Sequence, residues 1–253
     1  MKRVLLHALA LVGILALVAG GWLLWRNRPW WTAVSVNGRA LSVGELGMRA
    51  ATLLDDARRV EHLVVPKGRE AEIDLHYRRQ AAQMWIVKEI LLAEAVTRGY
   101  TVSPDDEKQA LAQVSARLKG RSLTPDQFFR EGPLPEEVKR RDFREGVLIN
   151  KFTSKEIGDA IVVSPRDIDA RLTELQRLAL ATAKPGEKTR RTPTRKMALD
   201  MLRAERFRRG FRQMFRALFA KADVKSPVFP DLETVDGVSP SRPEDAEQTQ
   251  ESK

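Results

Sequence analysis

The fold begins with the stretch Ala33-Val-Ser-Val-Asn-Gly-Arg-Ala-Leu-Ser-Val-Gly-Glu-Leu46. Valines alternate with Ser35, which is the period-2 pattern of a strand. Asn37-Gly38 is typical of a two-residue hairpin turn, because both central positions of a type I′ turn need a positive φ. Ser42 and Glu45 have the spacing of a helix capping box. The stretch therefore predicts a β-hairpin followed at once by a helix.

An apolar run precedes this stretch. It extends over 22 residues from Val4 to Trp25, interrupted only by His7. As a helix it would measure about 33 Å, enough to cross a bilayer core. We expect residues 1–31 to form a transmembrane signal anchor with an interfacial flank; a cleaved signal peptide is the alternative. The basic pair Lys2-Arg3 favours a cytoplasmic N-terminus. The rest of the chain would then lie in the periplasm, attached to a bacterial inner membrane.

Three Ser/Thr-Pro pairs mark helix starts farther along the chain: Ser103-Pro104, Thr124-Pro125 and Ser164-Pro165. In each, the hydroxyl can cap a helix and the proline can occupy its first turn. Together with apolar spacing, these signals predict helices over Val43 to about Val64, Glu70–Arg98, Pro104–Leu118, Pro125–Glu131, Glu136–Ile157, Pro165–Ala181 and Arg195–Ala222. The short connections predict a mainly α fold: an orthogonal helical domain, residues 32–226, with a small N-terminal β-hairpin after one transmembrane helix.

Charge is unevenly distributed along the 253 residues, which carry a net charge of +10. The segment Lys184–Lys221 has thirteen Lys/Arg and three Asp/Glu, a difference of +10. Its first part, residues 184–194, is polar and predicts an exposed loop. After Val224, predicted to lie in a short strand, the chain becomes rich in Pro, Ser, Glu and Asp. That composition predicts a disordered acidic tail over residues 227–253.

A family resemblance rests on the order and spacing of several segments, none specific by itself. They are Val34–Ser42, Ile86–Ala95 closed by Arg98–Pro104, Leu123–Phe128, Leu148–Lys151 and Ile161–Ile168. Their order resembles the N-terminal chaperone domain of the SurA family and of the related membrane-anchored PpiD and PrsA foldases. The resemblance covers about Ala33 to Leu172, and a weaker similarity extends over Met197–Lys225.

The resemblance has two implications and one large departure. In that family the helical domain binds unfolded polypeptide, and a parvulin-type prolyl isomerase domain is usually inserted before the last helix. Here only 24 residues separate Leu172 from Met197, far fewer than a parvulin domain needs, and they contain no histidine. The resemblance therefore implies a chaperone-like domain without isomerase activity. It also implies that the last helix and the Val224 region fold back onto the N-terminal hairpin.

No pattern in the chain indicates catalysis, a metal or a cofactor. Cysteine is absent, and His62 and His76 lack partners at ligand spacing. Paired carboxylates such as Asp105-Asp106 are adjacent in a predicted helix, so they point in different directions. Phosphate-loop, nucleophile-elbow and dinucleotide fingerprints are missing from the sequence. We therefore expect a protein that is not an enzyme.

Two sets of residues are candidates for binding. Adaptable or large apolar side chains suit a surface that exchanges clients; alternatively they are core residues. The polypeptide-binding candidates are Met84, Trp85, Phe128, Phe129, Phe143 and Phe152. Arginines on the last helix could face anionic lipid or acidic client segments; alternatively they are a solvated face. These candidates are Arg208, Arg209, Arg212 and Arg216.

The sequence therefore predicts a membrane-anchored periplasmic protein that binds unfolded or nascent secreted and outer-membrane polypeptides without ATP. The alternative is a non-catalytic structural or assembly subunit that docks one fixed partner in an envelope membrane complex. The basic charge also fits nucleic acid, but the predicted extracytoplasmic location argues against that partner.

Overall fold

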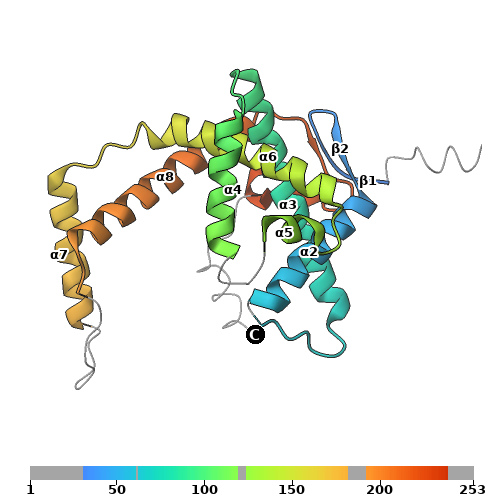
Figure 1. Cartoon of the computed structure of the whole chain (residues 1–253), viewed down its shortest axis with the longest axis horizontal. Helices are drawn as coiled ribbons and strands as arrows, with labels where there is room; N and C mark the ends of the chain where they lie inside the picture. Colours follow the sequence, from blue (N-terminus) through green and yellow to red (C-terminus); the bar gives the residue numbers. More distant parts are fainter. Residues whose placement is uncertain (1–30, 61, 119–123, 182–191, 239–253) are drawn as a thin grey trace, which may run out of the picture. The chain divides into compact units, whose positions relative to one another are not determined.

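A computed structural model describes residues 31–60, 62–118, 124–181 and 192–238. These residues form a mainly α-helical protein with one small three-stranded sheet near the N-terminus (Figure 1). The chain divides into two units. The first takes in residues 1–89, 126–139 and 222–253, and the second takes in residues 90–125 and 140–221.

The N-terminal hairpin has the predicted form. Strands β1 (Thr32–Val36) and β2 (Arg39–Ser42) pair antiparallel, with Val36 opposite Arg39. Asn37 and Gly38 at the turn have φ values of 50° and 81°, the two positive angles that the Asn-Gly pair predicts. Ser42 then accepts a hydrogen bond from the backbone N–H of Glu45 at 3.1 Å, which confirms the predicted cap.

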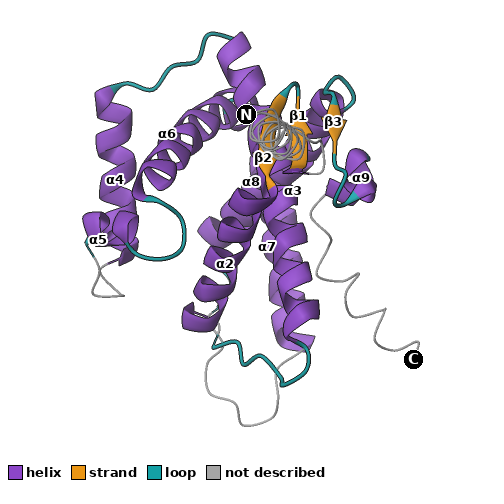
Figure 2. Cartoon of the chain, turned by 90° about the vertical axis from the view of Figure 1, so that its right-hand side faces the viewer, coloured by secondary structure: helices purple, strands orange, loops and turns teal. Residues whose placement is uncertain are grey.

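The sheet is completed from the other end of the chain. Strand β3 (Val224–Lys225) pairs antiparallel with β1, and the strand order is β2-β1-β3 (Figure 2). Val224 lies opposite Val36. This pairing confirms that the Val224 region returns to the hairpin. Because β1 is the central strand, both of its edges are hydrogen-bonded.

Helices supply most of the first unit's core. They are α2 (Val43–Val60), the part of α3 (Glu70–Thr97) before Ile90, and most of α5 (Pro125–Arg130). Buried apolar side chains come from the sheet and from these helices: Val34, Val36, Leu41, Leu46, Ala50, Ala81, Ala82, Trp85, Ile86 and Phe129. The alternating valines of β1 therefore point inward, as their period predicts.

The segment after β3 corrects the prediction of disorder from residue 227. It contains a 3₁₀ turn, η4 (Pro230–Glu233), and a short helix, α9 (Val235–Val238). Phe229, Leu232 and Val238 are buried, with Leu232 fully so. Composition suggested disorder because the segment is polar on average. Three apolar residues at suitable spacing are enough to hold it on the first unit. Residues 239–253 lie outside the described part of the chain.

Among the described residues of the second unit, every regular element is a helix. The unit contains the end of α3, α4 (Pro104–Leu118), α6 (Glu136–Thr153) from Arg140 onward, a π-helical turn η3 (Ser154–Gly158), α7 (Pro165–Ala181) and α8 (Arg195–Phe219). Its buried side chains include Ile90, Leu91, Ala95, Leu148, Phe152, Ile157, Ala198, Phe215, Leu218 and Phe219. The α4 and α7 bounds match the sequence prediction, whereas the helix predicted over Glu136–Ile157 changes to a π turn at its end.

Two predicted features fall on residues that the structure does not describe. The predicted anchor, residues 1–31, lies almost wholly within residues 1–30. Most of the predicted basic loop, residues 184–194, lies within residues 182–191. In the described part of the chain, no helix combines the length and the apolar character that a membrane span requires.

Candidate functional site

The six polypeptide-binding candidates divide between core and surface. Trp85, Phe129 and Phe152 are 6%, 2% and 0% exposed, so they are core residues and cannot contact a client. Met84 and Phe128, each beside a buried residue, are 55% and 39% exposed. The two surface positions belong to the first unit. The structure therefore does not gather the six residues into one client surface.

The sixth candidate, Phe143, is half-buried in the second unit. It lines an open pocket of about 590 Å³ between α4 and α6, together with Ala110, Val114 and Val147. Much of the remaining lining is polar, including Gln109, Gln113, Asn150 and Lys151. Phe143 is thus partly accessible, in a pocket whose lining is both apolar and polar.

A helical hairpin in the second unit carries more exposed apolar surface. Helix α7 runs alongside α8 (Figure 1), and no residue of α7 is buried although it has 17 residues. Leu178 and Leu180 on α7 are 53% and 79% exposed, and Met197 in the first turn of α8 is 47% exposed. Val162, shortly before α7, is 77% exposed. The hairpin and the segment before it therefore expose several apolar side chains to solvent.

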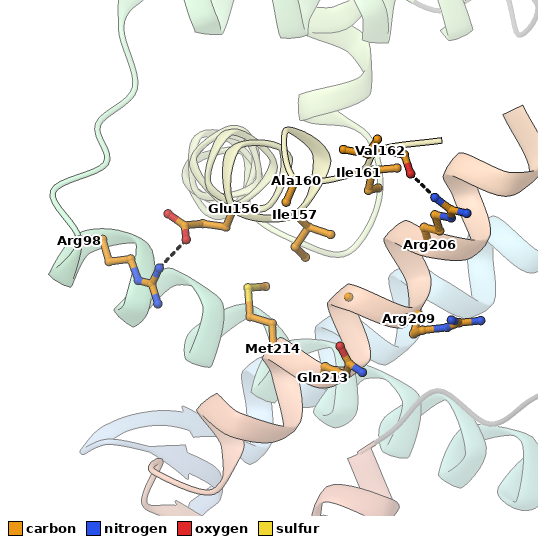
Figure 3. A pocket seen from close by; sticks show the side chains of 11 residues that line it. Arg98, Glu156, Ile157, Ala160, Ile161, Val162, Arg206, Arg209, Gln213 and Met214 are labelled. Carbon is orange, nitrogen blue, oxygen red and sulfur yellow. Dashed lines mark hydrogen bonds and ion pairs between the residues drawn. The ribbon is translucent and has the colours of Figure 1, made fainter. Parts of the chain in front are cut away.

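A second pocket, here called the α8 pocket, lies beside the C-terminal half of α8. It measures about 540 Å³ and is lined from η3, the segment after it and α8 (Figure 3). Its apolar lining consists of Ile157, Ala160, Ile161, Val162, Gly210 and Met214. Arg98, Glu156, Arg206, Arg209 and Gln213 complete it.

Close helix packing forms the floor of the α8 pocket. An added Cβ on Gly210 would lie 2.8 Å from Cγ2 of Ile157, closer than carbon atoms can pack. Glycine at this position therefore lets the Ile157 side chain of η3 pack directly against the backbone of α8. Along α8, the rings of Phe207, Phe211, Phe215 and Phe219 follow one another at centroid distances of 6.5, 6.2 and 5.8 Å. Phe215 and Phe219 are buried, so this row of rings packs partly inside the second unit.

Ion pairs hold one side of the α8 pocket. Arg98 lies 2.6 Å from Glu94 and 2.5 Å from Glu156. Its hydrogen bond to Glu94 raises the pKa of the guanidinium, and Glu156 adds to this effect. Glu156 also accepts a hydrogen bond from the Tyr100 hydroxyl at 2.8 Å, which raises the pKa of that hydroxyl. The one carboxylate in the pocket lining is thus already bonded twice.

Arg206 anchors the opposite side. Its guanidinium donates to the carbonyl of Val162 and lies 2.7 Å from Asp167. That contact lowers the pKa of Asp167, whose carboxylate also accepts from the N–H of Ser164. These bonds secure the segment between η3 and α7, which forms part of the pocket wall.

The four arginine candidates on α8 are all exposed. Arg209 pairs with Glu205 at 3.4 Å, one helical turn away. Arg208, Arg212 and Arg216 recur every four residues and so share one face. Within the described residues none of these three has a carboxylate within 4 Å, although Arg208 donates to the carbonyl of Ala204. Arg208, Arg212 and Arg216 therefore carry positive charge that no carboxylate among the described residues pairs with directly.

A separate charged cluster, formed by Ser103, Asp106 and Lys151, has a structural role. Asp106 accepts from the N–H and the hydroxyl of Ser103, and Lys151 lies 2.7 Å from its carboxylate. These hydrogen bonds, that from Lys151 first, lower the pKa of Asp106 to about 2. Lys151 also donates to the carbonyl of Thr101. The cluster joins the start of α4 to α6.

Sequence reasoning did not single out the α7–α8 hairpin or the α8 pocket. One signal was present: Leu175, Leu178 and Leu180 occur within six residues, and they cannot all face one neighbour along a helix. The pocket had no comparable signal, because it depends on the contact between Gly210 and Ile157. Comparison with known proteins adds nothing to these residues: no protein-family model and no curated protein matches the chain.

Proposed function

We propose that the chain is a chaperone-like protein that binds unfolded secreted or outer-membrane polypeptides without ATP, through the α7–α8 hairpin. The observation that best supports this proposal is that α7 has no buried residue and that Leu178 and Leu180 are exposed. A client segment that covers these leucines would remove apolar surface from water, at roughly 25 cal/mol per Å². The proposed binding surface lies on the hairpin, at the place in the chain order where the related foldases usually carry an isomerase domain.

The same proposal includes the type of helical domain and its attachment to a membrane. We take the helical region to be a SurA-N-like domain, anchored in a bacterial inner membrane by the N-terminal apolar segment. The strand pairing between Ser35 and Lys225 supports this, because the resemblance implies such a return. The order of helices α2 to α6 supports it as well.

An aggregation assay tests the binding surface. The full chain, at near-equimolar ratio, should slow light scattering by a urea-diluted β-barrel protein and by a reduced secreted protein. Leu178→Ser with Leu180→Ser should remove most of this effect. A matched control replaces Leu75 and Val64, which are 57% and 81% exposed in the first unit, with serine. No suppression with either client, or equal losses in the two double variants, would contradict the proposal.

A cross-linking experiment separates the proposal from the assembly-subunit alternative. A photoreactive amino acid at position 180, introduced in cells, would capture whatever covers α7. A heterogeneous set of secreted and outer-membrane proteins supports the chaperone function. One partner recovered in stoichiometric amount would instead identify a subunit of a fixed complex and overturn the proposal.

A further inference from the structure

The α8 pocket has the dimensions and the lining of a site for a side chain. Its volume of about 540 Å³ falls within the ~300–1,000 Å³ range of ligand pockets. Ile157 and Met214 lie on opposite walls and point into the space between η3 and α8 (Figure 3). Ala160 is exposed and Met214 half-buried, so these parts of the apolar lining are accessible, whereas Ile157 is buried beneath them. An apolar side chain of another molecule can enter the pocket without any rearrangement of the fold.

In the lining of the pocket, guanidinium groups outnumber carboxylates. Three guanidinium groups line it, from Arg98, Arg206 and Arg209, against the single carboxylate of Glu156. Arg98 and Arg206 are engaged in short ion pairs with Glu156 and Asp167, at 2.5 and 2.7 Å. Arg209 is different: its side chain is 64% exposed and its contact with Glu205 is 3.4 Å long. It can turn to a new carboxylate at little cost, because exposed pairs are worth only ~0–1 kcal/mol.

Neighbouring arginines extend this positive surface. Arg212 is one turn from Arg208 and three residues from Arg209, is exposed, and has no ion pair among the described residues. An acidic residue beside the pocket would therefore meet at least one cation that has no strong competing partner. A basic residue in the same place would be repelled.

We infer that the α8 pocket binds an apolar side chain of an unfolded polypeptide that carries an acidic residue beside it. The inference rests on the proposed function and narrows its client class. The apolar side chain lies on Ile157, Gly210 and Met214, and the neighbouring carboxylate pairs with Arg209. The exposed leucines of α7 contact apolar segments without regard to charge, whereas the pocket selects by charge.

Peptide binding tests the inference directly. The probes are fluorescent glycine–serine peptides that contain Leu-Glu-Glu, Leu-Gln-Gln, Leu-Lys-Lys or Ser-Glu-Glu, and fluorescence anisotropy with the full chain gives Kd. The Leu-Glu-Glu peptide should bind about fivefold more tightly than Leu-Gln-Gln, as one exposed charge pair allows. It should also bind about tenfold more tightly than Ser-Glu-Glu, because leucine burial is worth ~1.5 kcal/mol. Leu-Lys-Lys should bind most weakly of the leucine peptides.

Two matched pairs of variants locate the binding. Ala160→Trp fills the pocket and should weaken Leu-Glu-Glu about tenfold; Ala204→Trp, at an exposed position of α8 outside the lining, should change it less than about twofold. Arg209→Glu should abolish the preference for Glu over Gln. The adjacent Arg208→Glu makes the same charge change outside the lining and should preserve that preference.

Several results would overturn the inference. They are equal effects of the two tryptophan variants, equal effects of the two charge reversals, or no binding of any peptide by a chain that suppresses aggregation. Each is distinguishable from failure of the proposed function, which depends on Leu178 and Leu180. If replacement of these leucines removes the suppression of aggregation, the proposed function stands even when the inference about the pocket is contradicted.

Discussion

Asn37 and Asp223, 186 positions apart in the sequence, exchange two hydrogen bonds. The N–H of Asn37 donates to the carbonyl of Asp223 at 2.9 Å, and the N–H of Asp223 donates to the Asn37 side-chain oxygen at 2.9 Å. Asn37 also has a φ of 50°, which asparagine tolerates better than most residues. One residue thus sets the hairpin turn and holds the strand that returns from the far end of the chain.

Replacement of Asn37 tests this double role. Asn37→Ala should lower the free energy of unfolding by about 1–2 kcal/mol, because it loses the side-chain acceptor and puts alanine in the left-handed region. Asn37→Asp keeps an acceptor and should cost less. Asp223→Ala is the control, since both bonds use the Asp223 backbone. Urea titration measures all three. Equal losses for Asn37→Ala and Asp223→Ala would show that the side-chain bond contributes nothing.

A buried carboxylate makes the first unit sensitive to one surface arginine. Glu89 is 3% exposed, and its Oε2 lies 2.7 Å from Nη1 of Arg39, whose side chain is 54% exposed. Arg39→Ala leaves the carboxylate without this partner and should cost about 1–3 kcal/mol. With Glu89→Gln also present, Arg39→Ala should cost much less, because no charge is then left buried. A double-mutant cycle by thermal and urea unfolding checks this. Additive costs would contradict the pairing.

Acid should weaken the second unit through Asp106. The pKa of Asp106 is lowered from 3.8 to about 2 in the folded protein by Lys151 and Ser103. A depressed carboxyl pKa stabilises the fold above the unfolded-state value and loses that effect as pH falls toward the folded-state value. Stability should therefore decline between about pH 4 and pH 2. Asp106→Asn and Lys151→Met should flatten this decline, measured by urea unfolding at each pH.

A control for the acid prediction comes from an exposed pair. Lys155 lies 3.1 Å from Asp159 with both side chains about two-thirds exposed, so Lys155→Met should leave the pH profile unchanged. An identical flattening in Lys155→Met and Lys151→Met would mean that overall charge, and not the Asp106 cluster, governs the acid response.

The segment after β3 should contribute to stability. Leu232 is fully buried in η4, so Leu232→Ala should cost about 2–4 kcal/mol. Val228, 41% exposed four residues earlier, provides the control, and Val228→Ala should cost less than about 0.5 kcal/mol. Differential scanning calorimetry compares the two. A negligible effect of Leu232→Ala would restore the prediction that this segment is disordered.

The local features of the fold could be predicted from sequence. Asn37-Gly38 and the Ser-Pro helix starts were read correctly because their signals lie within a few adjacent residues. The Ser164 hydroxyl does accept from the N–H of Asp167, at 3.1 Å, as the cap predicts. The return of β3 was expected only through a family resemblance, because nothing local in Val224 specifies its partner strand.

The candidate site was predicted less well, for a physical reason. Met84 and Trp85, like Phe128 and Phe129, are adjacent residues of similar character, and one of each pair is buried while the other is exposed. Composition cannot tell them apart; only the orientation of the helix within the fold does. The α8 pocket could not be predicted for the same reason. Gly210 has no side chain that could signal a site, and its role depends on its contact with Ile157 in the folded protein.

The pairing of β1 with β3 has a consequence for synthesis on the ribosome. A chain made from its N-terminus exposes the open edge of β1 until Val224 and Lys225 emerge, 189 and 190 residues after Ser35. Folding of the first unit therefore cannot finish during translation of the helices, because contacts that distant in sequence form late. A product that ends before Val224 therefore keeps one edge of β1 without its hydrogen-bonding partner. The sheet can thus be completed only after the whole helical region has been made.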